Sequence, residues 1–263
     1  TIPAGELVAL VGRNGTGKST LLRAIAGLGE RLGGEIRLDG HSLETLSPQQ
    51  LATTVSFVTT ERVRIPNLRC EDVVALGRAP YTNWIGRVQE QDKAIVERSL
   101  ELVGMAAFAG KTMDRMSDGE CQRVMIARAL AQDTPIILLD EPTNGLDITS
   151  RQALKRIISR SMDDESTLLI STHQAHDFEN LLDHLVILGK GEILLNRSLD
   201  EISNRLLFAR TDILPAESIY SEQDLSGHFS ILPNEDGEEN TPDIELLYKA
   251  VLQQPEKIQS MFQ

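Results

Sequence analysis

The fold of this chain is decided by one stretch, Gly12-Arg13-Asn14-Gly15-Thr16-Gly17-Lys18-Ser19-Thr20. It follows an apolar run over 7–11 and opens onto a second apolar segment at 21–26. The order strand, glycine-rich loop, helix is the context in which the pattern G-x-x-x-x-G-K-[ST] binds phosphate. The glycines let backbone N–H groups converge on phosphate oxygens at the N-terminal end of a helix. The stretch therefore predicts a phosphate-binding loop.

The side chains of this loop suit a nucleoside triphosphate with its metal ion. Lys18 would pair with the β- and γ-phosphates, and the Ser19 hydroxyl would ligate Mg²⁺. The remaining loop positions expected to contact the bound phosphates are Gly12, Asn14, Gly15, Thr16, Gly17 and Thr20. The alternative is a chance glycine-rich turn, which the strand before it and the helix after it disfavour.

Composition narrows the class of protein. The chain has 263 residues, of which 41% are hydrophobic, and no apolar run approaches the ~18 residues of a membrane span. Its two cysteines, Cys70 and Cys121, have no metal-ligand spacing and fit a reducing compartment. The net charge is −13, and the segment from Asp212 onward contains eleven acidic residues but only two lysines. Because the chain is acidic and has no basic stripe, we expect no nucleic-acid partner.

Strands and helices alternate along most of the chain. Strands are predicted at 6–11, 33–40, 55–58, 136–140, 167–171, 185–188 and 192–195, and helices from Ser47 and at 71–76, 89–103, 117–131, 148–161 and 175–182. This alternation predicts a mainly parallel sheet covered on both faces. After Ser198 the pattern weakens, and 233–240 reads as an acidic, mobile linker. A last helix follows, with Ile244, Leu247, Val251 and Leu252 on one face for docking.

Two carboxylates end the apolar strand at 136–140. Asp140 is placed to hold Mg²⁺ through water, and Glu141 to act as general base on the attacking water. A strand that simply ends in solvated acids is the alternative, and the phosphate loop in the same chain disfavours it.

Further motifs follow in a fixed order. They are Met116-Ser117-Asp118-Gly119-Glu120-Cys121-Gln122-Arg123, the strand end at 139–142, Asn144-Gly145-Leu146-Asp147 and Ser171-Thr172-His173. With the phosphate loop, they resemble the motifs of the ATP-binding subunit of ABC transporters over about 4–199. The resemblance implies an α/β fold of the P-loop NTPase (RecA-like) type, a mainly parallel sheet flanked by helices, with a helical signature subdomain at about 70–131.

The resemblance also implies a domain organisation. Residues 1–199 would form the ATPase domain, and 200–263 a short acidic C-terminal extension with a docking helix. The family's base-stacking aromatic lies upstream of Thr1, so an N-terminal piece is expected to be missing from this sequence.

In the family that the chain resembles, two subunits pair head to tail around two ATP molecules. Ser117 and the Gly119 backbone would touch the partner's γ-phosphate, Asp147 would communicate across the dimer, and His173 would help place the water. Each has a structural alternative: Ser117 with Glu120 also forms a capping box, and His173 could be a polar strand end.

Three positions depart from the family pattern. The signature usually reads Leu-Ser-Gly-Gly-Gln, but here Asp118 and Glu120 replace a glycine and the glutamine. An acid beside a γ-phosphate is unfavourable, so Asp118 is expected to face solvent. The glutamine that ligates Mg²⁺ is replaced by Thr60, with Glu61 as the competing oxygen donor.

The segment from Asp72 to Arg87, with Tyr81 and Trp84 as interface anchors, resembles importers of iron–siderophore complexes, haem and cobalamin. This implies a homodimer on transmembrane permease subunits at the cytoplasmic face of the plasma membrane, served by a periplasmic or surface substrate-binding protein. The rival interpretations are a soluble ABC ATPase that does not transport and a regulatory module that binds ATP with little turnover. In the family that the chain resembles, cargo contacts lie in other subunits.

Overall fold

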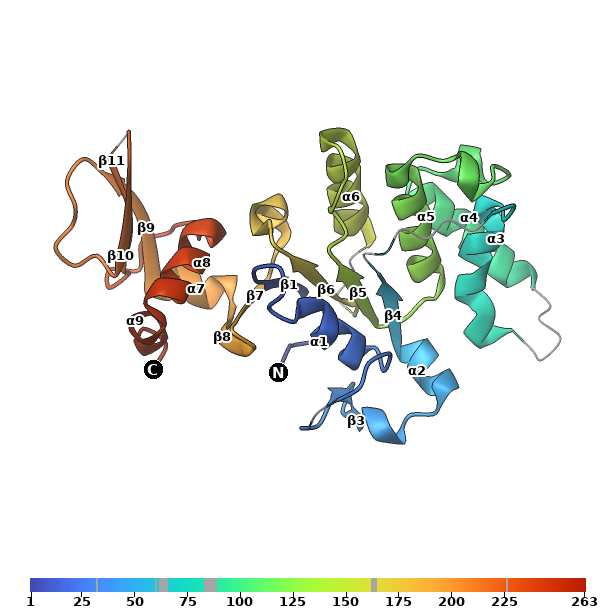
Figure 1. The fold of residues 1–263 in the computed structure, drawn as a ribbon, viewed down its shortest axis with the longest axis horizontal. Coiled ribbons are helices and arrows are strands. Elements are labelled where there is room, and N and C mark those ends of the chain that lie inside the picture. The colour runs from blue at the N-terminus through green and yellow to red at the C-terminus, as the bar shows by residue number, and fades with distance from the viewer. Residues whose placement is uncertain (32, 60, 62–65, 83–88, 162–164, 226) are drawn as a thin grey trace. The chain divides into compact units, whose positions relative to one another are not determined.

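The computed structural model describes residues 1–263 except 32, 60, 62–65, 83–88, 162–164 and 226 (Figure 1). The chain divides into two compact units. The first unit contains residues 1–6 and 19–171, and the second unit contains residues 7–18 and 172–263.

The first unit is built on three parallel strands. They are β4 (Val55–Val58), β5 (Ile136–Asp140) and β6 (Thr167–Thr172). β5 pairs with β4 on one side and with β6 on the other, and the second pairing sets Asp140 opposite Ser171. Because parallel strands share their direction, the carboxyl ends of β5 and β6 meet at one edge, where polar side chains gather.

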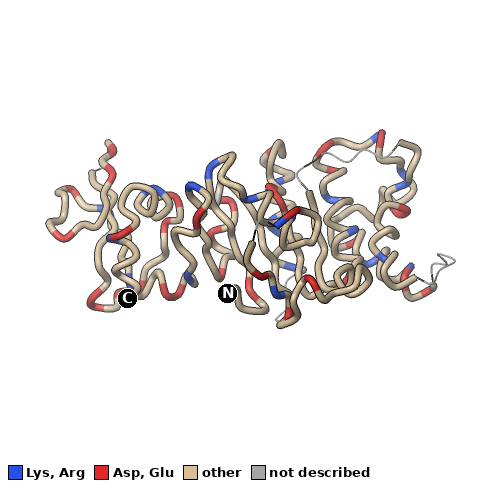
Figure 2. Tube along the Cα trace, turned by 60° about the horizontal axis from the view of Figure 1, so that its bottom comes forward, with Lys and Arg blue, Asp and Glu red and all other residues tan. Residues whose placement is uncertain are grey.

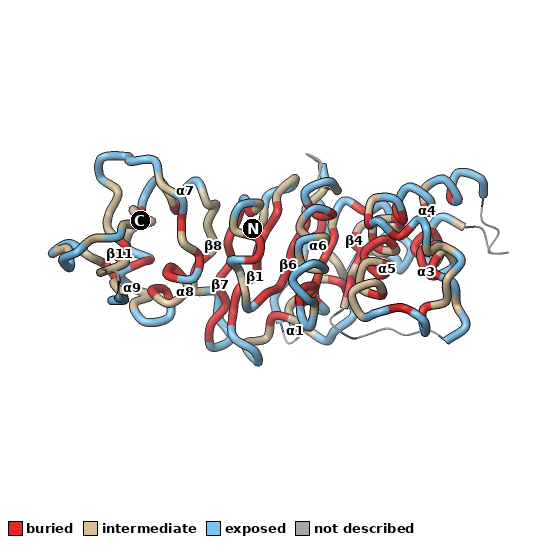
Figure 3. The backbone as a smooth tube through the Cα atoms, turned by 90° about the horizontal axis from the view of Figure 1, so that it is seen from above, coloured by how far each residue is buried: buried red, intermediate tan, exposed pale blue. Residues whose placement is uncertain are grey.

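Helices cover these strands. The helices of the first unit are α1 (Lys18–Ile25), α2 (Pro48–Thr54), α3 (Cys70–Ala75), α4 (Glu90–Leu102), α5 (Asp118–Ala131) and α6 (Ile148–Ser161). The 3₁₀-helix η2 (Leu76–Tyr81) continues α3, and further 3₁₀ turns are η1 (Leu43–Thr45), η3 (Ala106–Phe108) and η4 (Met113–Arg115). α5 contacts α3, α4, α6 and β4. Figure 3 shows β4 and β6 as mainly buried, while α6 exposes residues along its outer side.

Local sequence explains where these helices begin. Ser47 caps α2 through a reciprocal capping box with Gln50, and Ser117 does the same for α5 with Glu120. α6 has the predicted bounds, and α3, α4 and α5 lie within one residue of theirs.

The second unit has its own sheets. β1 (Leu7–Val11) pairs in parallel with β7 (His184–Gly189), which pairs antiparallel with β8 (Glu192–Ser198). After α7 (Leu199–Arg205) comes an antiparallel sheet in the order β10 (Tyr220–Asp224), β11 (Gly227–Pro233), β9 (Leu206–Thr211). α8 (Ile244–Gln253) and α9 (Pro255–Ser260) end the chain. With β4–β5, β5–β6 and β1–β7 all parallel, the predicted mainly parallel α/β class is confirmed.

The structure differs from the sequence prediction at several elements. The strand expected at 33–40 shrinks to β2 (Arg37–Leu38), which forms a short hairpin with β3 (His41–Ser42). The helix expected at 175–182 is two 3₁₀ turns, η5 (Ala175–Asp177) and η6 (Glu179–Leu181). The segment expected to be a mobile linker is held by side-chain amides: Asn234 and Asn240 both donate to the Ser203 carbonyl.

The end of the chain packs inside the second unit. α8 contacts β7, β8 and η5, and it buries Ile244, Leu247 and Val251, whereas Leu252 remains partly exposed. Lys249 of α8 pairs with Glu222 and Glu245. Figure 2 shows acidic residues on the loops of this part of the chain. No helix within the described residues combines the length and apolarity that a membrane span requires.

Candidate functional site

The phosphate loop connects β1 to α1 and turns sharply at its glycines. Gly15 and Gly17 have φ values of +83° and +99°, a backbone region that glycine adopts without strain. A Cβ on Gly12 would lie 2.7 Å from Thr16 Oγ1 and 2.8 Å from the Leu188 carbonyl oxygen. The loop is therefore packed so tightly against β7 that a larger residue than glycine does not fit at position 12.

Lys18 is buried in this loop. Its Nζ donates to the carbonyl oxygen of Gly12 at 2.7 Å and to that of Arg13 at 3.3 Å. Because the side chain folds back over its own loop, its ammonium group lies where the backbone curves. This places a positive charge beside the loop's N–H groups, the arrangement that anionic phosphates require.

Ser19, the next residue, belongs to the first unit. Its hydroxyl donates to Asp140 Oδ1 at 3.0 Å. Asp140 is the last residue of β5 and is only 2% exposed. The predicted pair of oxygen donors, one from the loop and one from the apolar strand, thus lies within hydrogen-bond distance.

Ser171 bonds to the carboxylate of Asp140 and to the backbone of Glu141. Its hydroxyl donates to Asp140 Oδ1 at 2.6 Å and accepts from the Glu141 backbone N–H at 2.9 Å. Ser171 is fully buried, and the β5–β6 register places it opposite Asp140. The sequence motif drew attention to this segment but gave Ser171 no role, because only strand pairing reveals its partners.

Glu141 follows Asp140 in an unusual backbone conformation. Its φ is +46°, which costs a residue with a Cβ energy and persists only where surrounding contacts enforce it. Its N–H bonds to both the Ser171 hydroxyl and the Ser171 carbonyl oxygen. These contacts hold Glu141 in its strained backbone conformation directly after Asp140.

The signature segment begins α5 with a complete capping box. The Ser117 hydroxyl accepts from the Glu120 N–H at 3.2 Å, and Glu120 Oε2 accepts from the Ser117 N–H at 2.7 Å. The Ser117 N–H bond, more than any other contact, holds the pKa of Glu120 below its ordinary value. Glutamate therefore performs the capping that a glutamine would perform, which accounts for this departure from the usual signature. Ser117 is exposed, and Asp118 is half-buried rather than fully turned to solvent.

Gly119 lies directly against the start of α6. A Cβ on it would be 2.6 Å from Ser150 Oγ and 3.2 Å from Ser150 Cβ. Ser150 in turn donates its backbone N–H to Asp147 Oδ1 at 2.7 Å, and bonds from Ser150 lower the pKa of Asp147. Ser150 thus joins the predicted residues Gly119 and Asp147, and it was not singled out from the sequence.

The other predicted residues take simpler positions. Asn14 and Thr20 are exposed, and Thr16 bonds through its hydroxyl to the Arg13 carbonyl oxygen. His173 is exposed immediately after β6. Thr60 and Trp84 lie outside the described residues.

Glu61, the competing oxygen donor, is paired with Arg23 of α1 at 2.8 Å. Both side chains are largely exposed, so this pair is weak and readily broken.

Comparison with known proteins identifies the family. Residues 1–144, more than half of the chain, match the ABC transporter family. The chain belongs to the ABC transporter family. It is 40% identical over 178 residues to an uncharacterised ABC transporter ATP-binding protein of Methanocaldococcus jannaschii, covering 68% of this chain and 61% of that protein. The chain thus spans less than two thirds of that relative.

Two further ABC proteins extend the comparison. A hemin import ATP-binding protein of Nocardia farcinica is 37% identical over 194 residues, which cover 73% of this chain and 66% of that protein. A dimeric ATP-binding cassette solved in a post-hydrolysis state with ADP and Pi has a TM-score of 0.66 and 27% identity, covering 76% of this chain and 88% of that one. The predicted ABC cassette fold is therefore confirmed.

The donor set of this ABC cassette suits magnesium. Ser19 and Asp140 offer a hydroxyl and a carboxylate, the hard oxygen ligands that Mg²⁺ takes together with water and substrate phosphates. Among the described residues, no group of three or more His, Cys, Asp and Glu side chains is placed to hold a metal ion by itself. The residues present fit a metal ion that is bound jointly with nucleotide rather than in a closed protein cage.

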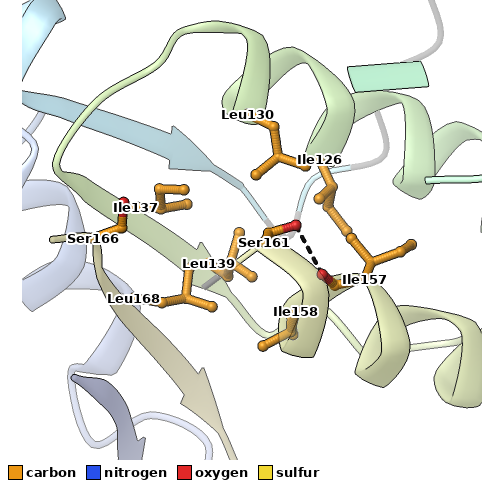
Figure 4. A pocket seen from close by; sticks show the side chains of 9 residues that line it. All are labelled: Ile126, Leu130, Ile137, Leu139, Ile157, Ile158, Ser161, Ser166 and Leu168. Carbon is orange, nitrogen blue, oxygen red and sulfur yellow. Dashed lines mark hydrogen bonds between the residues drawn. The ribbon is translucent and has the colours of Figure 1, made fainter. Parts of the chain in front are cut away.

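A small hollow of the first unit lies between α5, α6, β5 and β6 (Figure 4). It measures about 20 Å³, and its lining residues are Ile126, Leu130, Ile137, Leu139, Ile157, Ile158, Ser161, Ser166 and Leu168. The Ser161 hydroxyl is turned away into a bond with the Ile157 carbonyl oxygen. A hollow of this size holds about one water molecule, so it is a packing gap and not a ligand site.

Proposed function

We propose that this chain is the ATP-binding and ATP-hydrolysing subunit of an ABC importer for iron–siderophore complexes, haem or cobalamin. The observation that carries the proposal is the buried group at the ends of β5 and β6. There Ser171 holds Asp140 against Ser19 and holds Glu141 in its strained turn. The name of the Nocardia farcinica relative supports a haem-type cargo, and the family supports ATP as fuel.

Each group then has one task. Lys18 and the N–H groups of the loop hold the β- and γ-phosphates, and Ser19 with Asp140 would hold Mg²⁺, which neutralises phosphate charge. Glu141 accepts a proton from the water that attacks the γ-phosphate, and ADP and phosphate leave. His173, exposed after β6, orients that water and contacts the γ-phosphate.

The signature end supplies the second half of each ATP site. Ser117 is exposed at the N-terminus of a helix of 14 residues, where N–H groups and the helix dipole favour an anion. A head-to-tail homodimer would bring Ser117 and the Gly119 backbone to the partner's γ-phosphate, with Asp147 at the dimer contact. The dimeric cassette among the solved structures supports this assembly.

A hollow of about 310 Å³ in the first unit suits a permease contact. Its lining residues are Arg23, Leu28, Phe57, Thr59, Glu61, Val73, Leu76, Met125 and Arg128. Leu28 and Leu76 are exposed large apolar residues, flanked here by two arginines. Exposed apolar residues beside arginines are typical of protein contacts. We assign it to the cytoplasmic side of the permease, and this assignment agrees with a proposed position at the inner face of the membrane.

The remaining assignments follow from this function. Residues 1–199 form the ATPase domain with its helical subdomain at about 70–131, and 200–263 form the C-terminal extension with α8 as its docking helix. A periplasmic or surface substrate-binding protein delivers the cargo. Thr60 stays proposed as a further oxygen donor to Mg²⁺.

Reconstitution tests the proposal. The chain and its permease, to be sought among the neighbouring genes, are placed in proteoliposomes. ATP-dependent uptake of a ferric siderophore, haem and cobalamin is then measured against the Glu141→Gln variant. Uptake of one cargo by the wild type alone is expected. An ATP hydrolysis rate that does not change with the permease, together with no uptake, would favour the soluble ATPase. ATP binding without turnover would favour the regulatory module.

A further inference from the structure

The 3₁₀-helix η2 clasps the C-terminal end of the signature helix α5. Arg78 of η2 is buried, and its Nη1 donates to the Ala131 carbonyl oxygen at 2.8 Å. The last carbonyls of a helix have no partner within the helix, and a cation there also suits the helix dipole. Arg78 therefore caps α5 from a separate element of the chain.

A buried ion pair fixes the direction of Arg78. Its Nε lies 2.9 Å from Asp92 Oδ1, and both side chains are only 7% exposed. Asp92 also accepts from the Gln89 N–H at the start of α4. The bond from Arg78, more than any other contact, lowers the pKa of Asp92. Arg78 thus joins α5 to the beginning of α4 through one guanidinium group.

Two neighbours of Arg78 close the clasp. A Cβ on Gly77 would lie 2.3 Å from the Arg128 carbonyl oxygen, so η2 touches the α5 backbone directly. The centroid of the Tyr81 ring lies 4.0 Å from the Arg78 guanidinium carbon, and the Tyr81 hydroxyl donates to the Asp133 carbonyl oxygen at 3.0 Å. Tyr81, expected to be an interface anchor, makes these contacts inside the first unit.

The contacts of η2 with α5 lie between the hollow that we assign to the permease and the signature residue Ser117. Val73 and Leu76, just before Arg78, line the 310 Å³ hollow that we assign to the permease. At the other end of α5, about 21 Å away along a helix of 14 residues, is Ser117. A helix gripped at one end transmits a shift of that end to the other as a rigid body.

We propose that Arg78 is a positioning residue that transmits permease contact to the signature serine through α5. The inference rests on the proposed function and names a regulatory link within it. Arg78 bonds to Asp92 and to the Ala131 carbonyl oxygen, and its proposed effect on the signature serine passes through α5.

The test uses the permease complex with two matched variants. In Arg78→Lys the charge remains, but a single ammonium cannot reproduce the guanidinium's two differently directed bonds. Arg98→Lys makes the same chemical change on the exposed side of α4. We expect Arg78→Lys to lower permease-stimulated turnover at least tenfold, while unstimulated turnover and ATP affinity change less than twofold. Arg98→Lys should match the wild type in all three measurements.

A loss of stimulated and unstimulated turnover in equal proportion would overturn the proposal, because it would show a structural role only. So would unchanged stimulation. Hydrogen exchange gives a readout that does not require turnover. Permease binding should protect η2 in both proteins but protect 118–131 in the wild type alone. Permease-dependent protection of α5 in Arg78→Lys would also overturn the proposed role of Arg78. A wild-type protein whose turnover and hydrogen exchange do not respond to the permease would instead overturn the proposed function itself.

Discussion

The ends of β5 and of α5 carry polar groups that are held in opposite ways. At the end of β5, Asp140, Glu141 and Ser171 are 2%, 8% and 0% exposed, and they bond to one another and to Ser19. At the start of α5, Ser117 is exposed and is held by its own capping box. The polar groups at the end of β5 are therefore satisfied by one another within the first unit, whereas Ser117 at the start of α5 faces solvent.

This difference in burial determines how strongly substitutions at the two places should affect stability and turnover. Removing one partner of a buried hydrogen bond costs about 1–3 kcal/mol, because the other group is left unsatisfied away from water. Exposed groups find water instead and lose less. Substitutions at the end of β5 should therefore affect turnover and stability, while those at the signature should affect pairing of subunits.

The largest effect is expected at Glu141. Glu141→Gln keeps the shape of the side chain but removes its ability to accept a proton, so turnover should fall roughly 10²–10⁴-fold. ATP binding should persist, and the ATP-bound dimer should accumulate in size-exclusion runs with Mg-ATP. An unchanged turnover would remove Glu141 from the mechanism.

Ser171 should come next. Ser171→Ala removes the hydroxyl that joins Asp140 to the Glu141 N–H, so we expect turnover to fall about 10–100-fold and unfolding free energy by about 1–2 kcal/mol. Steady-state ATPase assays and urea denaturation measure both.

Ser99→Ala is the matched control for Ser171. It also removes a hydroxyl of a buried serine, one that donates to the Ile95 carbonyl oxygen within α4. It should lower stability without a specific loss of turnover. Equal losses of turnover in the two variants would mean that Ser171 acts only on folding.

The sequence was sufficient for the parts of the site that are local in the chain. The phosphate loop, the acids after β5 and the cap at Ser117 each depend on neighbours within a few residues, and all were predicted. The role of Ser171 was not predicted, because its partners are set by strand register. The burial of Arg78 was not predicted, because arginine is usually a surface residue. Only the structure shows that Asp92, fourteen positions away, lies beside it.

The fold follows the same rule. Strands of the parallel sheet were predicted from their continuous apolar runs, which burial on both faces demands. The sheet of β9, β10 and β11 was missed because its strands are only partly buried and carry polar residues such as Glu222 and Asp224. Such strands are stabilised by cross-strand pairs that single-segment patterns do not contain.

Gly119 tests the packing behind the signature end. In Gly119→Ala the new methyl group would lie 2.6 Å from Ser150 Oγ, so the start of α5 must shift away from α6. We expect ATP-dependent dimer formation to weaken about tenfold, or ~1.4 kcal/mol, by analytical ultracentrifugation. Adding Ser150→Ala removes the nearest atom and should restore part of the loss.

Gly33 provides the control for Gly119. A Cβ on it would meet nothing within 4 Å, so Gly33→Ala should leave dimer formation unchanged. Weakened pairing in both glycine variants would contradict the assignment of the effect to Ser150.

The smallest effect is expected at Glu120, where the signature departs from the family. Glu120→Gln keeps a group that can accept from the Ser117 N–H but removes the negative charge from the helix N-terminus, a charge that contributes about 0.3–1 kcal/mol. Because the folded pKa of Glu120 is lowered, the stabilisation from its charge is present above its ordinary value of 4.5 and is lost as the pH falls through the folded pKa. Wild type should therefore be the more stable protein at neutral pH, and the difference should shrink below about pH 4. Urea denaturation at the two pH values measures it, and a difference that stays constant with pH would show that the side chain acts by shape and not by charge.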